Sequence, residues 1–599
     1  MNADYQTNPV AQAATGYNKS FESTVIAALE FNQKLDFLTE GLSLKALASF
    51  KNWSSSTNAR AGKWNRFALT GYEEDGNGGY TYTTSRIGDE FQTDLTATNS
   101  TSGDRRFYLE GMLNYSRTFD EHDINAMFIY SQDEYVNNVP GNGNFIGSLP
   151  KRKQGVAARA SYAYAGKYMA EVNVGYNGSE NFAKGHRFGL FPSVAVGYNI
   201  SEENFFKPLK NTISKLKLRA SWGLVGNDQI SDARFLYMSQ INLSGKGFTT
   251  GVNQNVTYSG PVYQRYANED ITWEVGEKIN FGVDLQLFRS LDLTFDIFRE
   301  NRRDIFQEKQ TVPTYMGTAS TKVYGNLAAM RNQGFELAAS YNKQFNKDWF
   351  VSFKGTFTYA HNEITKYDES PKYPWQSKVG ASANMNAIYI ADGLFIDSED
   401  IAHHQQQLGS TIVPGDIKYV NVSRDWYGYD DNLTDTDDWV WAKYPSVPEI
   451  VYGFGPSIKW KNLDFSFFFQ GVAKTSFMVK DMHPFGDNSL RNVLSWIADE
   501  RWSPDNQNTN ATYPRLSRKT NANNTKLSTY WQRNGAFLKL KNAEIGYTHK
   551  NMRIYISGSN LLTFAPFKLW DPEQGGGSGL SYPTQRVFNI GFQMTINNK

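Results

Sequence analysis

Large apolar side chains alternate with small or polar ones along the segment RVFNIGFQMTIN, residues 586–597. Successive side chains of a β-strand point to opposite faces, so this period of two predicts a strand with one apolar and one polar face. The apolar face must meet either a protein core or lipid. Its members are Phe588, Ile590, Phe592, Met594 and Ile596.

The same alternation recurs along most of the chain, for example in the segments 23–33, 123–136 and 291–301. By the period-two criterion we expect about 16 to 17 strands of roughly 10 to 16 residues each. Strands of soluble proteins are commonly about 5 to 6 residues long. The expected strands are therefore long, and they favour one large all-β architecture over several small domains.

Short and long connections alternate between these expected strands. Five connections are long, and two links break the alternation, because 181–187 is short where a long loop is expected and 200–213 is long where a short turn is expected. Alternating short turns and long loops are typical of an up-and-down barrel in an outer membrane, with short periplasmic turns and long extracellular loops. The pattern thus predicts a large antiparallel transmembrane β-barrel whose apolar faces contact lipid, and a soluble all-β protein with repeated sheets is the alternative. The short turns are 119–122, 165–167, 289–291, 345–348, 461–462 and 549–551, and the long loops are about 55–104, 227–269, 307–330, 367–446 and 479–533.

Composition narrows the class of protein. The formal net charge is +1, so no overall field points to nucleic acid as a partner. The chain contains no cysteine, which excludes disulfides and thiolate metal sites. Mean hydropathy is −0.55 and no apolar run approaches the roughly 20 residues of a membrane helix, whereas barrel strands need only every second residue to be apolar.

The order of the expected strands indicates that the N-terminal strands of a barrel are absent. If the last strand ends on the periplasmic side, counting back about 17 strands places the start of the first strand outside. Single-chain bacterial barrels have an even strand count and start inside. The first 20 residues also lack the basic and apolar regions of a signal peptide. We therefore expect a chain that lacks an N-terminal portion.

Several stretches resemble one family. They are RNQGFELAASYNKQFNKDWFVSFKGTFTYAHNEI (331–364), ADGLFIDSEDI (391–401), PGDIKYVNV (414–422), VPEIVYGFGPSIKWKNLDFSFFFQG (447–471) and YPTQRVFNIGFQMTI at the end of the chain. In this order they resemble the C-terminal part of a SusC/RagA-like TonB-dependent outer-membrane transporter of the Bacteroidota. The resemblance covers essentially the whole chain.

The resemblance implies a 22-stranded barrel with a plug, of which residues 1–599 are the C-terminal β-barrel portion. The plug domain, the TonB box and the signal peptide are then absent, and the chain is incomplete. The family implies import of oligosaccharides, or of peptides in some branches, at the cell outer membrane. It implies a SusD-like surface lipoprotein as partner, and a TonB complex reached only through the missing N-terminal region. A passive porin-like channel and a cell-surface β-rich binding protein remain alternatives.

No motif supports an enzyme, a cofactor or a metal centre. His403 and His404 are adjacent and point in different directions, which makes a poor metal pair. The loop 425–438 carries six Asp residues, but it lacks the ordered spacing of a calcium loop. We interpret it as a solvated acidic loop, with a calcium site as the alternative.

Aromatic residues concentrate in the expected outer loop 367–446. Aromatic faces suit the C–H faces of sugars and the apolar side chains of peptides. The functional hypothesis is a substrate-contacting loop, and the alternative is that these rings pack a small core of the loop or touch a partner. The candidate substrate-binding residues are Trp375, Trp426, Tyr427, Tyr429, Trp439 and Trp441.

Overall fold

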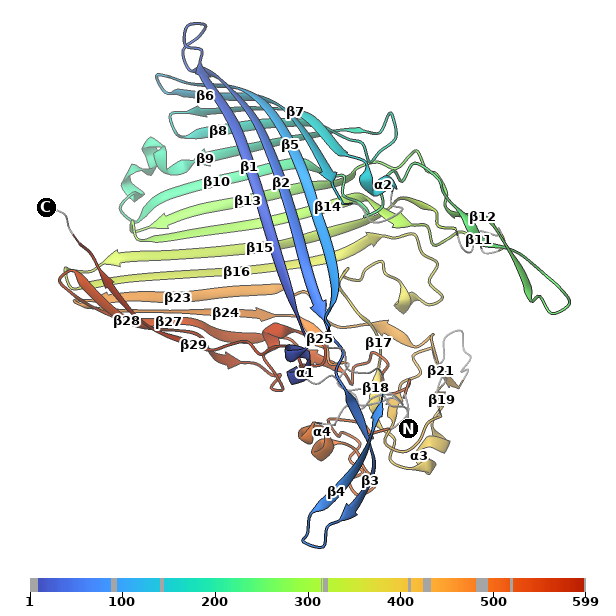
Figure 1. Cartoon of the computed structure of the whole chain (residues 1–599). Helices are drawn as coiled ribbons and strands as arrows, with labels where there is room; N and C mark the ends of the chain where they lie inside the picture. Colours follow the sequence, from blue (N-terminus) through green and yellow to red (C-terminus); the bar gives the residue numbers. More distant parts are fainter. Residues whose placement is uncertain are drawn as a thin grey trace.

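One curved antiparallel sheet of 17 strands dominates the computed structural model (Figure 1). The structure describes residues 9–87, 94–139, 145–313, 315, 321–407, 411–423, 432–480, 494–517 and 521–596. The all-β prediction and the strand count are confirmed. The strands of the sheet are β1 (Gly16–Lys34), β2 (Leu42–Ala61), β5 (Thr96–Phe119), β6 (His122–Asn137), β7 (Lys151–Tyr164), β8 (Tyr168–Ser179), β9 (Phe188–Asn199), β10 (Ile213–Asn227), β13 (Glu274–Leu287), β14 (Leu291–Glu308), β15 (Tyr324–Gln344), β16 (Trp349–Lys366), β23 (Ile450–Trp460), β24 (Leu463–Ala473), β27 (Phe537–His549), β28 (Met552–Phe564) and β29 (Val587–Met594).

Each strand of this sheet pairs with the strands that precede and follow it along the chain. All of these ladders are antiparallel. At the two ends of the order, β1 pairs only with β2 and β29 only with β28, as far as the described residues go. The sheet therefore has two edges, formed by β1 and β29.

The short turns lie where the sequence predicts them. Between β7 and β8, Ala165 and Gly166 both have positive φ, at 52° and 66°. The three residues 165–167 join the paired residues Tyr164 and Tyr168, and the backbone N–H of Lys167 donates to the carbonyl of Tyr164 at 2.8 Å. Glycine supplies one of the two positive-φ positions of this tight turn without steric cost. The long link between β9 and β10 is also confirmed, and it contains η1 (Ile200–Glu202) and η2 (Asn204–Leu209).

Several strands exceed the expected upper length of about 16 residues. β2 has 20 residues and β5 has 24, and the two pair along the whole of β2, from Leu42↔Tyr115 to Ala61↔Thr96. Ser, Thr and Asn fill the ends of both strands, so the ladder continues where the apolar alternation has stopped. The predicted long loop 55–104 is therefore wrong at both ends, since the long link between β2 and β5 is 62–95.

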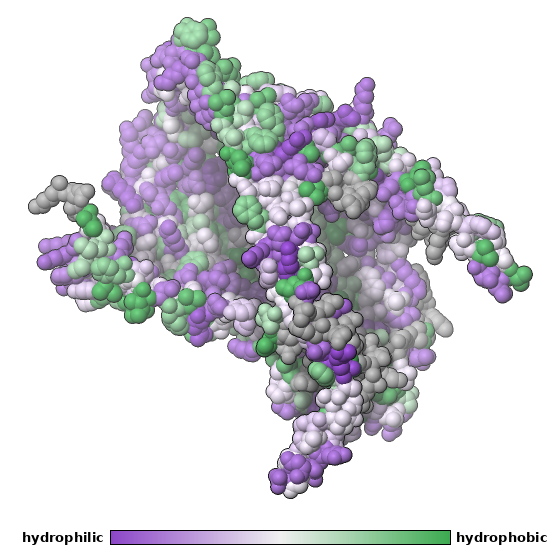
Figure 2. All heavy atoms as spheres, in the orientation of Figure 1, coloured by the Kyte–Doolittle hydropathy of each residue, from purple (hydrophilic) through white to green (hydrophobic). Residues whose placement is uncertain are grey.

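The apolar face of β29 is exposed. Ile590 is 82% exposed and pairs with Ile556 on β28, which in turn pairs with Ile545 on β27. All three isoleucines are more than half exposed, and Figure 2 shows apolar side chains along these strands at the lower left. No second sheet covers them among the described residues. Such a face is stable against hydrocarbon rather than water.

Small elements occupy the long loops. Two hairpins project away from the sheet, and short strand pairs and helices lie in the remaining loops (Figure 1). None of the helices in the described ranges is long and apolar enough to cross a membrane. The hairpins are β3 (Arg66–Glu74) with β4 (Tyr80–Ile87) and β11 (Gln240–Thr250) with β12 (Val256–Arg265); the other elements are β17 (Ala387–Tyr389), β18 (Ala391–Leu394), β19 (Gln406–Gln407), β20 (Ile417–Tyr419), β21 (Leu433–Thr434), β22 (Trp439–Trp441), β25 (Ser476–Met478), β26 (Gln532–Asn534), α1 (Pro9–Ala14), α2 (Phe145–Ser148), α3 (Ser398–His403), α4 (Ser495–Glu500), η4 (Pro374–Gln376) and η6 (Pro572–Gln574).

Candidate substrate-facing surfaces

The face of the sheet opposite the exposed apolar side chains is polar and ion-paired. On β10, Arg219 donates hydrogen bonds to Asp284 on β13, at 3.0 and 3.1 Å, and to Asp296 on β14, at 3.1 Å. On β28, Arg553 pairs with Asp464 on β24 and with Glu544 on β27. Alternation thus directs charged side chains to the interior, as in barrels with a wet lumen.

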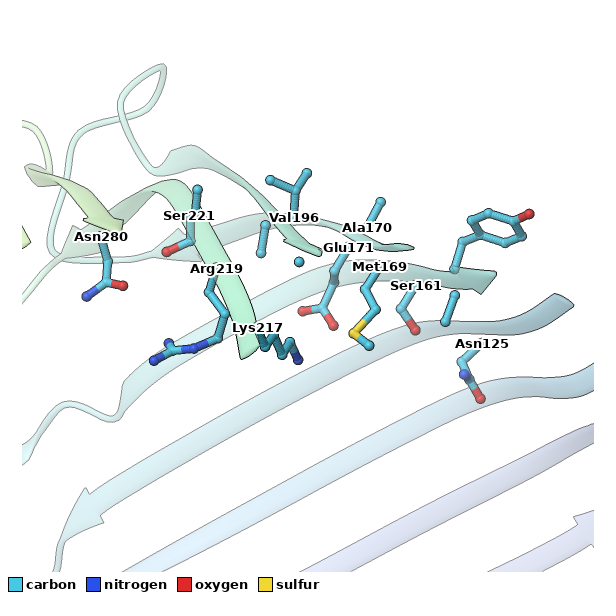
Figure 3. A pocket seen from close by; sticks show the side chains of 15 residues that line it. Asn125, Ser161, Met169, Ala170, Glu171, Val196, Lys217, Arg219, Ser221 and Asn280 are labelled. Carbon is cyan, nitrogen blue, oxygen red and sulfur yellow. The ribbon is translucent and has the colours of Figure 1, made fainter. Parts of the chain in front are cut away.

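A hollow of about 430 Å³ lies against this interior wall. Figure 3 shows Glu171, Lys217 and Arg219 pointing to one side of the sheet and Val196 to the other. Asn125, Ser161 and Asn280 add neutral hydrogen-bonding groups to the lining. The wall here offers both charges and amide groups, which suits polar material passing or docking inside the barrel.

Three of the aromatic residues predicted to contact substrate are brought together in the loop 367–449. Trp375 lies in η4, and Trp439 and Trp441 lie in β22, which pairs with β17. The indole N–H of Trp441 donates to the carbonyl of Ser377 at 2.7 Å, and that of Trp375 donates to the carbonyl of Asp437 at 3.1 Å. Segments about 60 residues apart in sequence are held side by side by these bonds.

The rings of this aromatic cluster, Tyr373, Trp375, Trp439 and Trp441, form two contacting pairs. Tyr373 stacks on Trp375 with centroids 4.6 Å apart and an interplanar angle of 11°, and Trp439 meets Trp441 edge-on at 5.2 Å. The four rings are half-buried, so they pack within the loop and still present surface to solvent. The other three predicted residues, Trp426, Tyr427 and Tyr429, lie outside the described residues.

Three outer loops share one hydrophobic core. We call 367–449, 474–536 and 565–586 together the outer loop layer. Its core holds Tyr419 from the first loop, Tyr513 and Trp531 from the second and Phe567 from the third, all almost fully buried. The described parts of the three loops therefore pack together as one unit, and sequence reasoning did not identify this core.

Asp416 is a buried carboxylate at the centre of a polar network beside this core. Its side chain is fully buried, and Arg515 pairs with it at 2.7 Å. The side-chain amides of Asn521 and Asn524 donate to the same carboxylate at 2.9 and 3.0 Å. The backbone N–H of Val413 donates to its other oxygen at 3.0 Å. One carboxylate thus joins the first two loops of the outer loop layer.

The prediction of a solvated acidic loop is wrong for Asp438. This side chain is fully buried. It accepts hydrogen bonds from the backbone N–H groups of Val422, Ser423 and Asp435, at 2.8 to 2.9 Å, and from the hydroxyl of Ser423 at 3.0 Å. The carboxylate replaces missing backbone partners in an irregular turn. Asp425, Asp430 and Asp431 lie outside the described residues.

Metal-ligand clusters of three or more His, Asp or Glu side chains do not occur in the described part of the chain. His403 is exposed and its ring contacts the carbonyl of Glu399 at 2.8 Å. His404 packs edge-on against Phe395 at 5.1 Å, and its burial lowers the pKa of the imidazole. The two rings have separate surroundings.

Lys539 fixes the third loop of the outer loop layer to the mouth of the barrel. It lies on β27, is almost completely buried, and donates to Asp571 and Glu573 at 2.6 Å each. Burial by itself raises the pKa of both carboxyl groups. The hydrogen bonds from Lys539 outweigh this effect and leave the pKa of Asp571 and of Glu573 below their ordinary values.

Because the pKa values of Asp571 and Glu573 are lowered by folding, their contribution to stability is complete above the ordinary carboxyl pKa of about 4. It is lost as the pH falls below that value. We expect the protection of residues 565–586 from hydrogen exchange, taken relative to the intrinsic exchange rate at each pH, to fall on acidification before that of β27 and β28. The D571N/E573Q variant should lack this acid-dependent step; a step of unchanged size in that variant would contradict the assignment.

The wet interior, the lipid-exposed exterior and the packed outer loops together define a large outer-membrane β-barrel. The family described as "TonB dependent receptor-like, beta-barrel" matches residues 2–561. The chain therefore belongs to this family and is an outer-membrane protein, as the sequence motifs predict.

Two relatives that are named TonB-dependent receptors are similar in sequence to most of this chain. The chain is 25% identical over 543 residues to "TonB-dependent receptor P3" of Formosa agariphila, covering 81% of this chain and 52% of that relative. It is 25% identical over 461 residues to "TonB-dependent receptor SusC" of Bacteroides thetaiotaomicron, covering 73% of this chain and 43% of that relative. The chain thus spans about half the length of these relatives.

Among solved structures, "Structure of the RagAB peptide transporter" superimposes with a TM-score of 0.72 at 19% identity, covering 98% of this chain and 64% of that chain. The fold of nearly all of the chain is therefore that of this transporter barrel.

Proposed function

We propose that this chain forms the barrel wall and outer loops of a nutrient importer of the SusC type, for oligosaccharides or peptides. Membership of the TonB-dependent receptor family supports this proposal most strongly. The ion-paired interior around Arg219 and Arg553 suits passage of polar solutes. The half-exposed aromatic cluster at the outer mouth offers ring faces that suit sugars or apolar peptide side chains.

The proposed importer works with two further proteins. A SusD-like surface lipoprotein would deliver substrate to the outer loop layer, and a TonB complex would supply energy through a region N-terminal to this barrel. The named relatives and the RagAB structure support this arrangement by similarity.

The two sheet edges support a larger barrel. A strand edge in hydrocarbon leaves backbone N–H and C=O groups without partners, so a spanning sheet must close. β1 and β29 both run from the loop side to the turn side, because β1 leads into a short turn and β29 follows a long loop. Direct pairing between them would be parallel in an otherwise antiparallel sheet. We infer that an odd number of additional strands completes the barrel, which makes the total even.

Closure can be tested by expressing residues 1–599 alone in a strain that lacks the complete receptor. We expect no restored growth on the transported nutrient, or a leak of small solutes, since the sheet edges are unpaired. Supplying the preceding part of the receptor as a separate polypeptide should restore uptake. Full rescue by residues 1–599 alone would contradict the need for additional strands.

The aromatic cluster can be tested by replacing Trp439 with alanine in the complete receptor. Loss of one ring contact should raise the half-saturation concentration for uptake about threefold to tenfold, in keeping with aromatic contacts of roughly 0.5–1.5 kcal/mol. The maximal rate should change little. Uptake of labelled oligosaccharides and peptides would be measured in whole cells.

Tyr582→Ala is the matched control, because Tyr582 is an exposed ring on a different outer loop, 565–586. Equal effects of the two substitutions would show that the aromatic cluster does not contact the substrate. Intact hydrogen exchange in residues 436–441 of the Trp439→Ala variant would exclude unfolding of the loop as the cause.

A further inference from the structure

The long inner link between β9 and β10 folds onto the outside of the barrel. Tyr168 begins β8 and Tyr198 lies near the end of β9, and the two residues are paired across the ladder with rings stacked at 5.0 Å. Glu203, in the link, accepts hydrogen bonds from the hydroxyls of Tyr168 at 2.7 Å and Tyr198 at 3.3 Å. Lys167, in the adjacent turn, adds an ion pair to Glu203 at 3.3 Å.

Tyr168 and Tyr198 belong to the lipid-facing side of the sheet. Strand alternation places Tyr168 on the same face as Val172, and Tyr198 on the same face as Val194 and Val196. These valines are about half exposed, and Figure 3 shows Val196 on the side of the sheet opposite Glu171 and Lys217. A link held by these two tyrosines therefore lies over the lipid-facing surface at the turn end of the strands.

The link exposes large apolar side chains at this place. Phe205 is 68% exposed and Leu209 is 50% exposed, whereas Phe206 between them is buried. The neighbouring turn adds Phe288, 60% exposed, whose backbone N–H donates to the carbonyl of Thr212 at 2.8 Å. Exposed aromatic and aliphatic side chains on a surface in water would be unfavourable, but they are favourable where the surface meets a bilayer.

Basic side chains accompany these apolar ones. Lys207 and Arg289 are exposed beside Phe205 and Phe288 in sequence, and Lys210 pairs with Glu202 at 3.0 Å. Long basic side chains near the end of a spanning segment extend to the phosphate groups of lipids. Tyrosines such as Tyr168 and Tyr198 are enriched at the same depth.

We propose that residues 200–212 form an interfacial anchor in the periplasmic leaflet, with Phe205 and Leu209 inserted among phospholipid acyl chains. Lys207 and Arg289 contact the lipid phosphates. The continuity of this patch with the lipid-facing valines of β8 and β9 identifies phospholipid as the occupant. The proposal depends on the barrel's placement in the outer membrane and is independent of the transported substrate.

Residues 1–599 contain no cysteine, so a cysteine introduced among them can be spin-labelled specifically once any cysteine elsewhere in the complete receptor is replaced by serine. Single-cysteine variants F205C and L209C would be labelled in the complete receptor, purified and reconstituted in vesicles of phosphatidylethanolamine and phosphatidylglycerol. Collision with oxygen, which concentrates in lipid, would be compared with collision with a water-soluble nickel chelate. We expect both labels to favour oxygen, as a label at lipid-facing V196C does.

Two controls report exposure to water. K347C lies in the turn between β15 and β16 on the same side of the membrane, and L243C lies on the projecting β11–β12 hairpin; both should favour nickel. Nickel accessibility at 205 and 209 equal to that at 347 would overturn the proposal. Protection from nickel in isolated outer membranes but not in the phospholipid vesicles would assign the patch to a protein partner and would equally overturn it.

Discussion

Replacing Asp416 with alanine is expected to open the outer loop layer while leaving the membrane sheet intact. The substitution leaves Arg515, a half-buried cation, without its partner and removes the buried acceptor for Asn521 and Asn524. Removing one member of a fully buried ion pair costs about 3–5 kcal/mol, and the partial exposure of Arg515 places the expected cost at the lower end of that range. Hydrogen exchange of residues 391–419 and 495–517 should therefore rise strongly, while exchange in β14 and β15 should not.

The control for Asp416 is Glu308→Ala. Glu308 pairs with Lys322 at 2.8 Å, but Lys322 is exposed and Glu308 is only half-buried, and such surface pairs contribute about 0–1 kcal/mol. Limited proteolysis of membrane-inserted receptor would provide a second readout, because opened loops become cleavable. If Asp416→Ala and Glu308→Ala give the same exchange and cleavage, Asp416 does not hold the loops together.

Replacing Ile556 with arginine is expected to impair insertion of the barrel. Ile556 pairs with Ile545 and Ile590, so the new charge would lie in the centre of an apolar row. Arginine on the lipid face of a barrel costs about 2–4 kcal/mol near the bilayer midplane. The variant of the complete receptor should show a smaller fraction of heat-modifiable, folded protein in outer membranes.

The adjacent residue provides the matched control for Ile556. Ser557 pairs with Glu544 and Asn589 on the interior face, where an arginine meets polar groups. Ser557→Arg should therefore fold almost as well as the parent. Equal folding of the two arginine variants would contradict the assignment of the Ile556 face to lipid.

The sequence predicts the membrane sheet well because one physical pattern repeats in every strand. The alternation in RVFNIGFQMTIN corresponds to β29, and the turn at 165–167 corresponds to the observed hairpin. The alternation does not predict the loop ends of β2 and β5. Polar residues face water on both sides of the sheet at these ends, so apolar and polar positions do not alternate there. Strand length was consequently underestimated at the outer end.

The outer loops were predicted less completely because their structure depends on contacts between distant segments. Asp416 and Asn524 are more than 100 residues apart, and nothing in either local sequence indicates that they meet. Asp438 occurs in a run of acidic residues that is typical of a solvated loop. Its carboxylate is nevertheless buried, because backbone N–H groups of Val422, Ser423 and Asp435 supply its hydrogen bonds in place of water. Trp375, Trp439 and Trp441 were found from their clustering in sequence, and their role in substrate binding stays a prediction.

The consecutive order of the strands in the sheet has a consequence for biogenesis. Each new hairpin can add to an edge already present, so the wall can grow through contacts between sequence neighbours, which carry a low entropic cost of loop closure. Joining the two ends is different, because it brings together segments separated by the whole barrel. Closure between the first and last strands is therefore the assembly step whose rate an assembly factor that holds both ends open would affect most.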